Sequence, residues 1–489
     1  MKNSVGTPHV FLAVLFLGIF TMAARNATDP DIWWHLKTGQ YISEHKSVPR
    51  TDPFSFTRGG QPWIAHEWLT ELFLYELQRG VGFGGLIMTF AAVIPAAFFL
   101  LYLRCGPAPY IAGITTLWAA FATRPLWGVR PQVLSLLLTS LWLLLLERSD
   151  LRPRLLWWTV PLTLLWVNLH AGFALGLGLS ALFLVGEWIE RAHDSAAENS
   201  FHLRTAAFVL LVDLLIVPLN PNGVQLFTYP IETLRSHAMQ KYIAEWASSN
   251  FHHAEHWPFL FLILVTLAVF SWSRHPLRPR ELLLLLVSLY AALCSVRMVP
   301  FFVLIAAPVV SKRLGTWPKS SVAQPTVVRH TMNGAIVVAM VLFASTHAFH
   351  VIQHQPQTEA QRFPSQAVAF LAAHPPGTIF NHYDWGGYLI WRLYPSTRVF
   401  IDGRADLYGQ ELLDQFADAY QFESEWQKTL QAWNITTVIV PPASALATGL
   451  RNSRNWIVSY EDAQGIVFSS RPATADAPST PANLARAIP

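Results

Sequence analysis

The chain has 489 residues, of which 52% are hydrophobic and only 13% are charged. Soluble globular domains usually carry about 25% charged residues, so this composition excludes an ordinary soluble protein and predicts a polytopic α-helical membrane protein. The formal charge of +4 does not indicate binding to nucleic acid, because the basic residues lie in short clusters between apolar segments. The two cysteines, Cys105 and Cys294, are expected near opposite membrane faces, which argues against a disulfide.

Apolar segments long enough to cross a hydrocarbon layer of about 30 Å predict about eleven transmembrane helices. The first segment follows Lys2 and ends near small residues, as a signal peptide would. The ten further apolar segments favour an uncleaved first helix instead. The predicted helices cover residues 8–24, 83–104, 108–123, 131–147, 155–170, 172–190, 204–219, 256–273, 280–296, 298–311 and 331–350.

The loops between these segments predict the topology. If the N terminus is cytoplasmic, nearly every basic cluster falls in a cytoplasmic loop, as the positive-inside rule requires. The outer face then receives a long first loop, residues 25–82, a second loop at 220–255, and the C-terminal part. A helix starting at His66 that also crossed the membrane would place the stretch "RSDLRPR" outside. That segment carries three glutamates, so an interfacial amphipathic helix suits it better.

The C-terminal part of the sequence predicts a small α/β domain. The stretches "GTIF", "TRVFIDG" and "TTVIVPP" are typical of short strands, and "GQELLDQFADAYQFESEWQKTLQAW" is typical of a helix. The last stretch is rich in proline, alanine and threonine without apolar periodicity, so we expect disorder there. The predicted division is a transmembrane domain at 1–350, an extracytoplasmic α/β domain at 351–472 and a disordered tail at 473–489.

The first outer loop begins with the stretch "TDPDIWWHLKTGQYISEH". Its proline suits the first turn of a helix, with Asp29 as the N-cap. Asp31 and His35 are four residues apart and are expected on one helix face. Trp33 and Trp34 are expected in the headgroup layer, where a tryptophan can keep its polar edge in water.

This order of elements resembles the GT-C superfamily of glycosyltransferases, especially the branch of lipid A aminoarabinose transferases and protein O-mannosyltransferases. In that family a first transmembrane helix leads into a long outer loop with interfacial helices, and an early carboxylate in the loop is catalytic. Here "PDIWWHLKTGQYISEHKSVPRTDPFSF" occupies that place, and Asp31 matches the acidic residue after proline. The stretch "AHEWLTELFLYELQRGVGFGG" is similar to the second interfacial helix through His66 and Glu67.

The resemblance extends to bacterial membrane proteins without an assigned reaction, which share "YDWGGYLIW" and "FIDGRADLY" with this chain. It implies a transferase of the bacterial inner membrane that moves a sugar, hexose or pentose, from a polyprenyl-phosphate-linked donor to a lipid or envelope glycan acceptor on the outer face. The family carries a further acidic motif where this chain has "RPLWGVRPQ", which leaves the acceptor site open. The alternatives are a non-catalytic envelope scaffold or glycan-binding protein, and a transporter, which only Asp213 supports.

Such a transfer needs a base for the acceptor and cations for the departing phosphate. A carboxylate with a raised pKa can take the acceptor's proton; the catalytic candidates are Asp31 first, then Glu67 and His35. Arginine offers a planar fork for phosphate oxygens, although an arginine at a helix end can also extend to lipid headgroups. The candidate substrate-binding residues of the transmembrane part and its loops are Arg124, Arg130, Arg297, His66, Asn168 and His170.

Two motifs of the outer domain combine aromatic residues with acids, a combination that can stack on a sugar ring and accept its hydroxyl protons. They supply the further candidates Tyr383, Asp384, Trp385, Asp402, Arg404 and Asp406. In the alternative interpretation, Asp402 and Arg404 hold loops together. No metal-binding motif is present in the sequence, since His252, His253 and His256 form only a loose cluster. No cofactor is firmly implied, and a loosely held divalent cation stays open.

Overall fold

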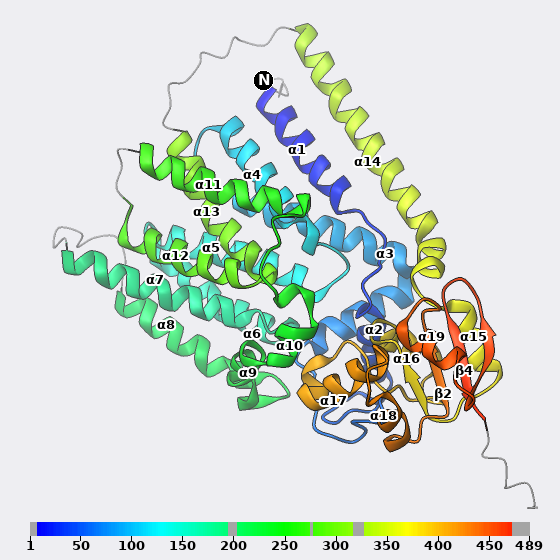
Figure 1. The fold of residues 1–489 in the computed structure, drawn as a ribbon. Coiled ribbons are helices and arrows are strands. Elements are labelled where there is room, and N and C mark those ends of the chain that lie inside the picture. Colours follow the sequence, from blue (N-terminus) through cyan, green and yellow to red (C-terminus); the bar gives the residue numbers. More distant parts are fainter. Residues whose placement is uncertain (1–6, 194–202, 274–276, 316–326, 472–489) are drawn as a thin grey trace, which may run out of the picture.

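The computed structural model describes residues 7–193, 203–273, 277–315 and 327–471. The predicted disordered tail lies outside these described residues. Figure 1 shows a large helical bundle, with a smaller domain of short helices and strands against one end of it. The first outer loop lies between the two parts.

Each of the eleven predicted apolar ranges overlaps a helix. Five of the described helices are long and apolar enough to cross a membrane, so the number of eleven spans stays a prediction. The bundle helices are α1 (Thr7–Ala23), α3 (Trp68–Tyr102), α4 (Pro109–Thr123), α5 (Pro131–Ser149), α6 (Thr159–Leu169), α7 (Phe173–His193), α8 (Leu203–Ile216), α11 (Trp257–Trp272), α12 (Pro279–Cys294), α13 (Val299–Leu314) and α14 (Val327–Arg362).

Helix α13 forms the centre of the bundle. It is buried from Val299 to Ser311 almost without interruption and packs against α4, α11 and α12. The outer helices expose large apolar side chains instead, among them Leu215 on α8, Trp272 on α11 and Phe349 on α14. Contiguous exposed apolar surface of this kind marks contact with membrane or partner.

Helix α3 is two helices joined at a break. Gly82 has φ 67°, a left-handed conformation that glycine adopts without steric cost. The residues before Gly82 form the charged segment that we expected at the interface, and those after it form the first long apolar segment of the bundle. The two parts of α3 therefore match the predicted interfacial helix that starts at His66 and the predicted transmembrane helix at 83–104.

Helix α2 (Ile32–His45) packs between α3 and the outer domain. The prediction that its tryptophans lie among lipid headgroups is wrong. Trp33 is only 1% exposed, and its ring contacts the rings of Phe83, Phe363 and Tyr388. Aromatic side chains bury large areas and dominate the packing energy where they meet, so Trp33 joins the loop to the outer domain.

The outer domain contains a four-stranded sheet in the order β1-β2-β4-β3, with β1 and β2 parallel and the other pairs antiparallel. The strands are β1 (Ile379–Asn381), β2 (Thr437–Val440), β3 (Trp456–Glu461) and β4 (Ile466–Ser470). The accompanying helices are α15 (Ser365–Ala373), α16 (Gly386–Leu393), α17 (Ala405–Tyr420), α18 (Trp426–Ala432) and α19 (Ala445–Arg451). Two short helices of the second outer loop, α9 (Tyr229–Arg235) and α10 (His237–Tyr242), lie nearby.

The local predictions for this domain are confirmed in part. The stretches "GTIF" and "TTVIVPP" form β1 and β2 as predicted. The stretch "TRVFIDG" is not a strand of the sheet, because its Val399 forms an isolated parallel bridge with Ser55 of the first outer loop. The single long helix is divided into α17 and α18 by a turn in which Phe422 has φ 60°. Helix α14 also continues past residue 350, where the sequence placed the domain boundary.

Backbone hydrogen bonds attach the first outer loop to this extended stretch. Phe56 N donates to Val399 O at 3.1 Å, and Val399 N donates to Phe54 O at 3.2 Å. The hydroxyl of Thr57 donates to Phe400 O at 2.6 Å. The interface between residues 52–57 and 399–404, called the loop seam below, therefore has the character of a domain interior.

Candidate functional site

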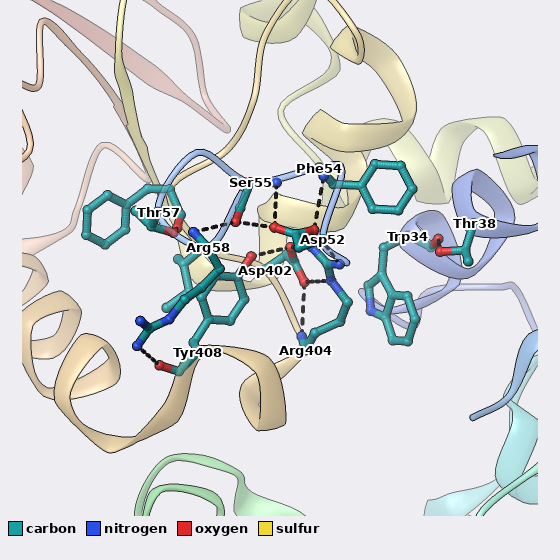
Figure 2. Close-up of polar contacts among 12 residues, drawn as sticks. Trp34, Thr38, Asp52, Phe54, Ser55, Thr57, Arg58, Asp402, Arg404 and Tyr408 are labelled. Carbon is teal, nitrogen blue, oxygen red and sulfur yellow. Dashed lines mark hydrogen bonds and ion pairs between the residues drawn. The ribbon is translucent and has the colours of Figure 1, made fainter. Parts of the chain in front are cut away.

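A buried group of charges lies at the centre of the loop seam (Figure 2). The guanidinium of Arg404 reaches Asp52 Oδ1 at 2.8 Å and Asp402 Oδ2 at 2.6 Å, and Tyr408 OH donates to Asp402 Oδ2 at 2.5 Å. The side chains of Arg404, Asp52 and Asp402 are at most 1% exposed. These contacts occupy Asp402 and Arg404 fully, which favours the interpretation that they hold loops together over a role in substrate binding.

Asp52 is held as a carboxylate. Its oxygens accept the backbone N–H groups of Phe54 and Ser55 at 3.0 Å each. Burial raises its pKa, but Arg404 and these hydrogen bonds outweigh burial, so the pKa of Asp52 is lowered. Asp52 gives no local signal in the sequence, and only its contact with Arg404, 352 positions away, reveals its role.

Asp31 lies at the edge of the loop seam, immediately before α2. Its Oδ1 accepts a hydrogen bond from Trp34 Nε1 at 3.0 Å. The backbone of Gly403 passes so close that a Cβ there would lie 1.7 Å from Asp31 Oδ1. A side chain at position 403 therefore cannot coexist with this position of the carboxyl group, which explains the glycine.

The environment of Asp31 raises its pKa to about 7. Burial is the largest cause, followed by the negative charge of Asp29; His35, the Trp34 hydrogen bond and Arg130 act in the opposite direction. A carboxyl group that titrates near neutral pH can exchange protons with a substrate hydroxyl at working pH. Asp31 therefore has the property expected of a general base.

Two of the three predicted arginines meet around acids close to Asp31. Arg130 Nε lies 2.5 Å from Asp29 Oδ2, and a second nitrogen of Arg130 binds Glu245. Arg297 Nη2 lies 3.3 Å from Glu245 Oε2, while Arg297 Nε is buried without a hydrogen-bond partner among the described residues. Glu245 therefore bridges the two arginines.

The prediction that Asp29 is the N-cap is wrong, because the N-cap of α2 is Asp31. One carboxylate oxygen accepts the backbone N–H of Asp31 at 2.9 Å, and the other forms the ion pair with Arg130. The regular helix starts later than the predicted cap implied, at Ile32. Asp29 therefore couples the backbone of Asp31 directly to the arginine.

A second group of titratable side chains surrounds Glu67. The imidazole Nε2 atoms of His66, His170 and His35 lie 3.0, 3.4 and 3.7 Å from its carboxylate. His35 Nδ1 also lies 3.3 Å from Glu71 Oε1. In the sequence, Glu71 is only one of the three glutamates that argue against a membrane-spanning helix at His66. The spacing of Glu67 and Glu71, four residues along one helix, is the signal that would have placed both on the same face.

These contacts distinguish Glu67 from Asp31. Burial raises the pKa of Glu67, but the facing histidines, His66 first, outweigh burial and lower it. For His35, burial lowers the pKa and the carboxylates of Glu71 and Glu67 outweigh it, so its pKa is raised. Glu67 is therefore a poor proton acceptor, and the geometry suits it to orienting the imidazoles.

The outer domain contributes Asp406 to this histidine cluster. Tyr229 OH donates to Asp406 Oδ2 at 3.2 Å, and the rings of Tyr229 and His66 lie 4.4 Å apart. Burial is the main cause of a raised pKa at Asp406, and His66 counteracts it. Tyr229, from the second outer loop, gave no local signal in the sequence.

The remaining candidates lie apart from this cluster. Arg124 is exposed, and its carbonyl accepts a hydrogen bond from Arg25. Asn168 is occupied structurally, since its Oδ1 accepts from Trp68 Nε1 at 2.8 Å. The segment Tyr383–Trp385 forms a short 3-10 helix beside the loop that carries Asp31. The Tyr383 hydroxyl is buried without a hydrogen-bond partner among the described residues. Asp384 is exposed and Trp385 is buried.

The described residues contain no group of three or more His, Cys, Asp or Glu side chains arranged to hold a metal ion. In the cluster around Glu67 the three imidazole Nε2 atoms lie around the carboxylate itself, and that of His66 forms a hydrogen bond with it at 3.0 Å. The geometry therefore gives no support to a dedicated cation site in this part of the chain.

The whole architecture has counterparts among solved structures. The archaeal oligosaccharyltransferase AglB from Archaeoglobus fulgidus, solved with an inhibitory peptide and a dolichol-phosphate, has a TM-score of 0.53 at 11% identity over 88% of this chain and 69% of its own. ArnT from Cupriavidus metallidurans, solved with undecaprenyl phosphate, has a TM-score of 0.50 at 12% identity over 97% of this chain and 100% of its own. The mycobacterial arabinofuranosyltransferase AftD has a TM-score of 0.51 at 14% identity over 96% of this chain and 40% of its own.

These three structures are GT-C superfamily members. The chain has the GT-C fold, and the resemblance noted in its first outer loop is confirmed at this level. No protein-family model and no curated protein sequence matches the chain. Identities of this size show the fold alone, so the reaction must be argued from the side chains.

Proposed function

We propose that the protein is a membrane glycosyltransferase that moves a sugar from a polyprenyl-phosphate-linked donor to a lipid or envelope glycan acceptor. The observation that carries the proposal is Asp31, a half-buried carboxyl group with a pKa of about 7 within electrostatic range of Arg130. A base that titrates near neutral pH and a cation for the leaving group are the two requirements of this transfer.

In the proposed reaction an acceptor hydroxyl attacks the anomeric carbon of the donor sugar. The bond from that carbon to the phosphate oxygen breaks, and its electron pair leaves with the phosphate. The hydroxyl proton passes to Asp31. The negative charge that develops on the departing phosphate is stabilised by Arg130 and Arg297, whose guanidinium groups can each bind two phosphate oxygens.

Glu245 and Asp29 hold these arginines in place when no donor is bound. Glu245 contacts both guanidinium groups, so the arginines are already oriented and a donor phosphate needs to compete with carboxylates rather than order two free side chains. Prior orientation of charged donors is the main source of electrostatic catalysis in enzymes.

Glu67, Glu71 and the histidines act as positioning residues in this proposal. His35 is held by both carboxylates and its raised pKa favours a positive charge near Asp31. That charge favours the ionised form of Asp31, which is the form a base requires. The cluster also connects α2, α3 and the turn after α6, so it fixes the position of the loop on the bundle.

The proposed site of action is the outer face of the bacterial inner membrane, with the N terminus cytoplasmic and the outer domain extracytoplasmic. The distribution of basic loops supports this orientation. The donor class is supported by two of the similar structures, which hold dolichol-phosphate and undecaprenyl phosphate.

The test is replacement of Asp31 by asparagine in a producing strain, with the envelope glycans quantified by mass spectrometry against wild type and a deletion strain. We expect the glycan lost on deletion to be lost in Asp31→Asn as well. Asp418→Asn, at an exposed position of α17, is the matched control and should keep the glycan. If deletion removes a glycan that Asp31→Asn retains in full, Asp31 is not the base.

A further inference from the structure

A cavity of about 390 Å³ lies beside the loop that carries Asp31. Its walls come from the end of α14, the segment Tyr383–Trp385 and the turn after β2, and they include Arg362, His382, Asp384 and Pro441. Ligand-binding cavities commonly have volumes of about 300–1,000 Å³, so this one has room for a sugar residue.

The lining of this cavity combines apolar and charged side chains. Pro441 and Pro442, which are half-buried, supply the apolar surface, and the buried Trp385 lies in the same wall. His382 Nδ1 is buried and has no hydrogen-bond partner among the described residues. Arg362 and Asp384 are exposed, and the charges of both act on His382.

The cavity is adjacent to the proposed base. Pro30 forms part of its wall, and the next residue is Asp31. The fit between Pro30 and the outer domain is close, because a Cβ on Gly387 would lie 2.9 Å from Pro30 O. Three consecutive residues thus have different roles. Asp29 binds Arg130, Pro30 borders the cavity, and Asp31 carries the carboxyl group of the proposed base.

We propose that this cavity is the acceptor subsite and that it binds a hydroxyl-rich sugar residue of the acceptor. A sugar ring presents apolar C–H faces, which suit the proline surface, and hydroxyl groups at its edge, which suit Asp384 as acceptor and Arg362 as donor. The proposal rests on the proposed transferase function, and it assigns the acceptor to the outer domain and the donor phosphate to the arginines of the bundle.

The test measures binding rather than turnover, so it stands apart from the test on Asp31. The full-length protein in nanodiscs is titrated with methyl α-D-mannopyranoside, N-acetylglucosamine and methyl β-L-arabinopyranoside, and binding is followed by saturation-transfer NMR. We expect at least one sugar to bind wild type at millimolar concentration. Asp384→Asn and Arg362→Gln should each weaken that binding about tenfold or more, since each removes a hydrogen bond to a charged group.

The controls are Asp418→Asn and Arg454→Gln, conservative changes at exposed positions of the same domain, which should leave binding unchanged. Gel filtration and thermal unfolding confirm that the cavity variants fold. Failure of wild type to bind any of the three sugars overturns the acceptor subsite, and so does binding that survives both cavity variants. The outcome for Asp31→Asn in cells is independent, so loss of the subsite and loss of the proposed reaction can be told apart.

Discussion

Replacing Arg404 by methionine tests whether the buried charges of the loop seam join the first outer loop to the outer domain. The substitution keeps most of the side-chain volume and leaves Asp52 and Asp402 as buried carboxylates without a cation. Breaking a buried ion pair by removing one partner costs about 3–5 kcal/mol. The backbone hydrogen bonds between Phe54, Phe56 and Val399 should then open more often, although the bundle stays folded.

Hydrogen–deuterium exchange with mass spectrometry measures this opening in the peptides that contain residues 52–58 and 399–408. A factor of ten in the opening equilibrium corresponds to ~1.4 kcal/mol, so the predicted cost implies exchange that is roughly 150- to 5,000-fold faster. Arg451→Met is the matched control, because the Arg451–Glu461 pair is 39% and 38% exposed and exposed pairs contribute only about 0–1 kcal/mol. Exchange in Arg404→Met that stays within threefold of wild type would refute the reasoning.

Two further predictions concern Asp31 and use quantification of the donor-dependent envelope glycan or of transfer in membranes. Asp31 must be ionised to act as a base and its pKa is about 7, so activity should fall as the pH drops below about 7. Asp29→Asn removes a negative charge that raises the pKa of Asp31, so the acidic limb of the pH profile should move to lower pH. An acidic limb that does not move contradicts the assignment of Asp31 as the base. Gly403→Ala should displace Asp31, because the new Cβ would lie 1.7 Å from Asp31 Oδ1, and a misplacement of ~1 Å can cost about 100-fold in rate. The control is Gly178→Ala, which should retain full activity because position 178 has open space around it. Equal activities of the two variants would contradict the prediction.

The local sequence pattern was sufficient to predict where the helices of the bundle lie along the chain. Apolar runs of the right length correspond to helices because a helix satisfies its own backbone hydrogen bonds wherever it lies. The break at Gly82 also follows from local chemistry, since a charged segment changes there into an apolar one. The stretch "TRVFIDG" shows the limit of this approach, because its β-branched residues favour extended backbone without specifying which strand or loop will pair with it.

The candidate site was predictable in its residue types and less so in its contacts. Asp31, His35 and Glu67 come from one loop. The structure brings His35 to 3.7 Å from Glu67, whereas the carboxyl group of Asp31 contacts Trp34 instead. Trp33 was assigned to the membrane interface because nothing near it in the sequence indicates that Phe363 and Tyr388 will cover it. Glu245 likewise gives no local sign of its contacts, since Arg130 and Arg297 come from other parts of the chain. Charges on distant segments acquire partners only through the tertiary fold.

The loop seam has a consequence for biosynthesis. Asp52 and its cation Arg404 are separated by 352 positions along the chain, and ribosomes add about 5–20 residues per second. The first loop must therefore wait on the order of 20–70 s for its counter-charge after it has been made. During that interval a carboxylate destined for the interior stays in water and the loop lacks its partner stretch. Synthesis of the segment that carries Arg404 and closure of the first loop are then a single late step, and chains that stall before that step expose an unfinished loop to proteases.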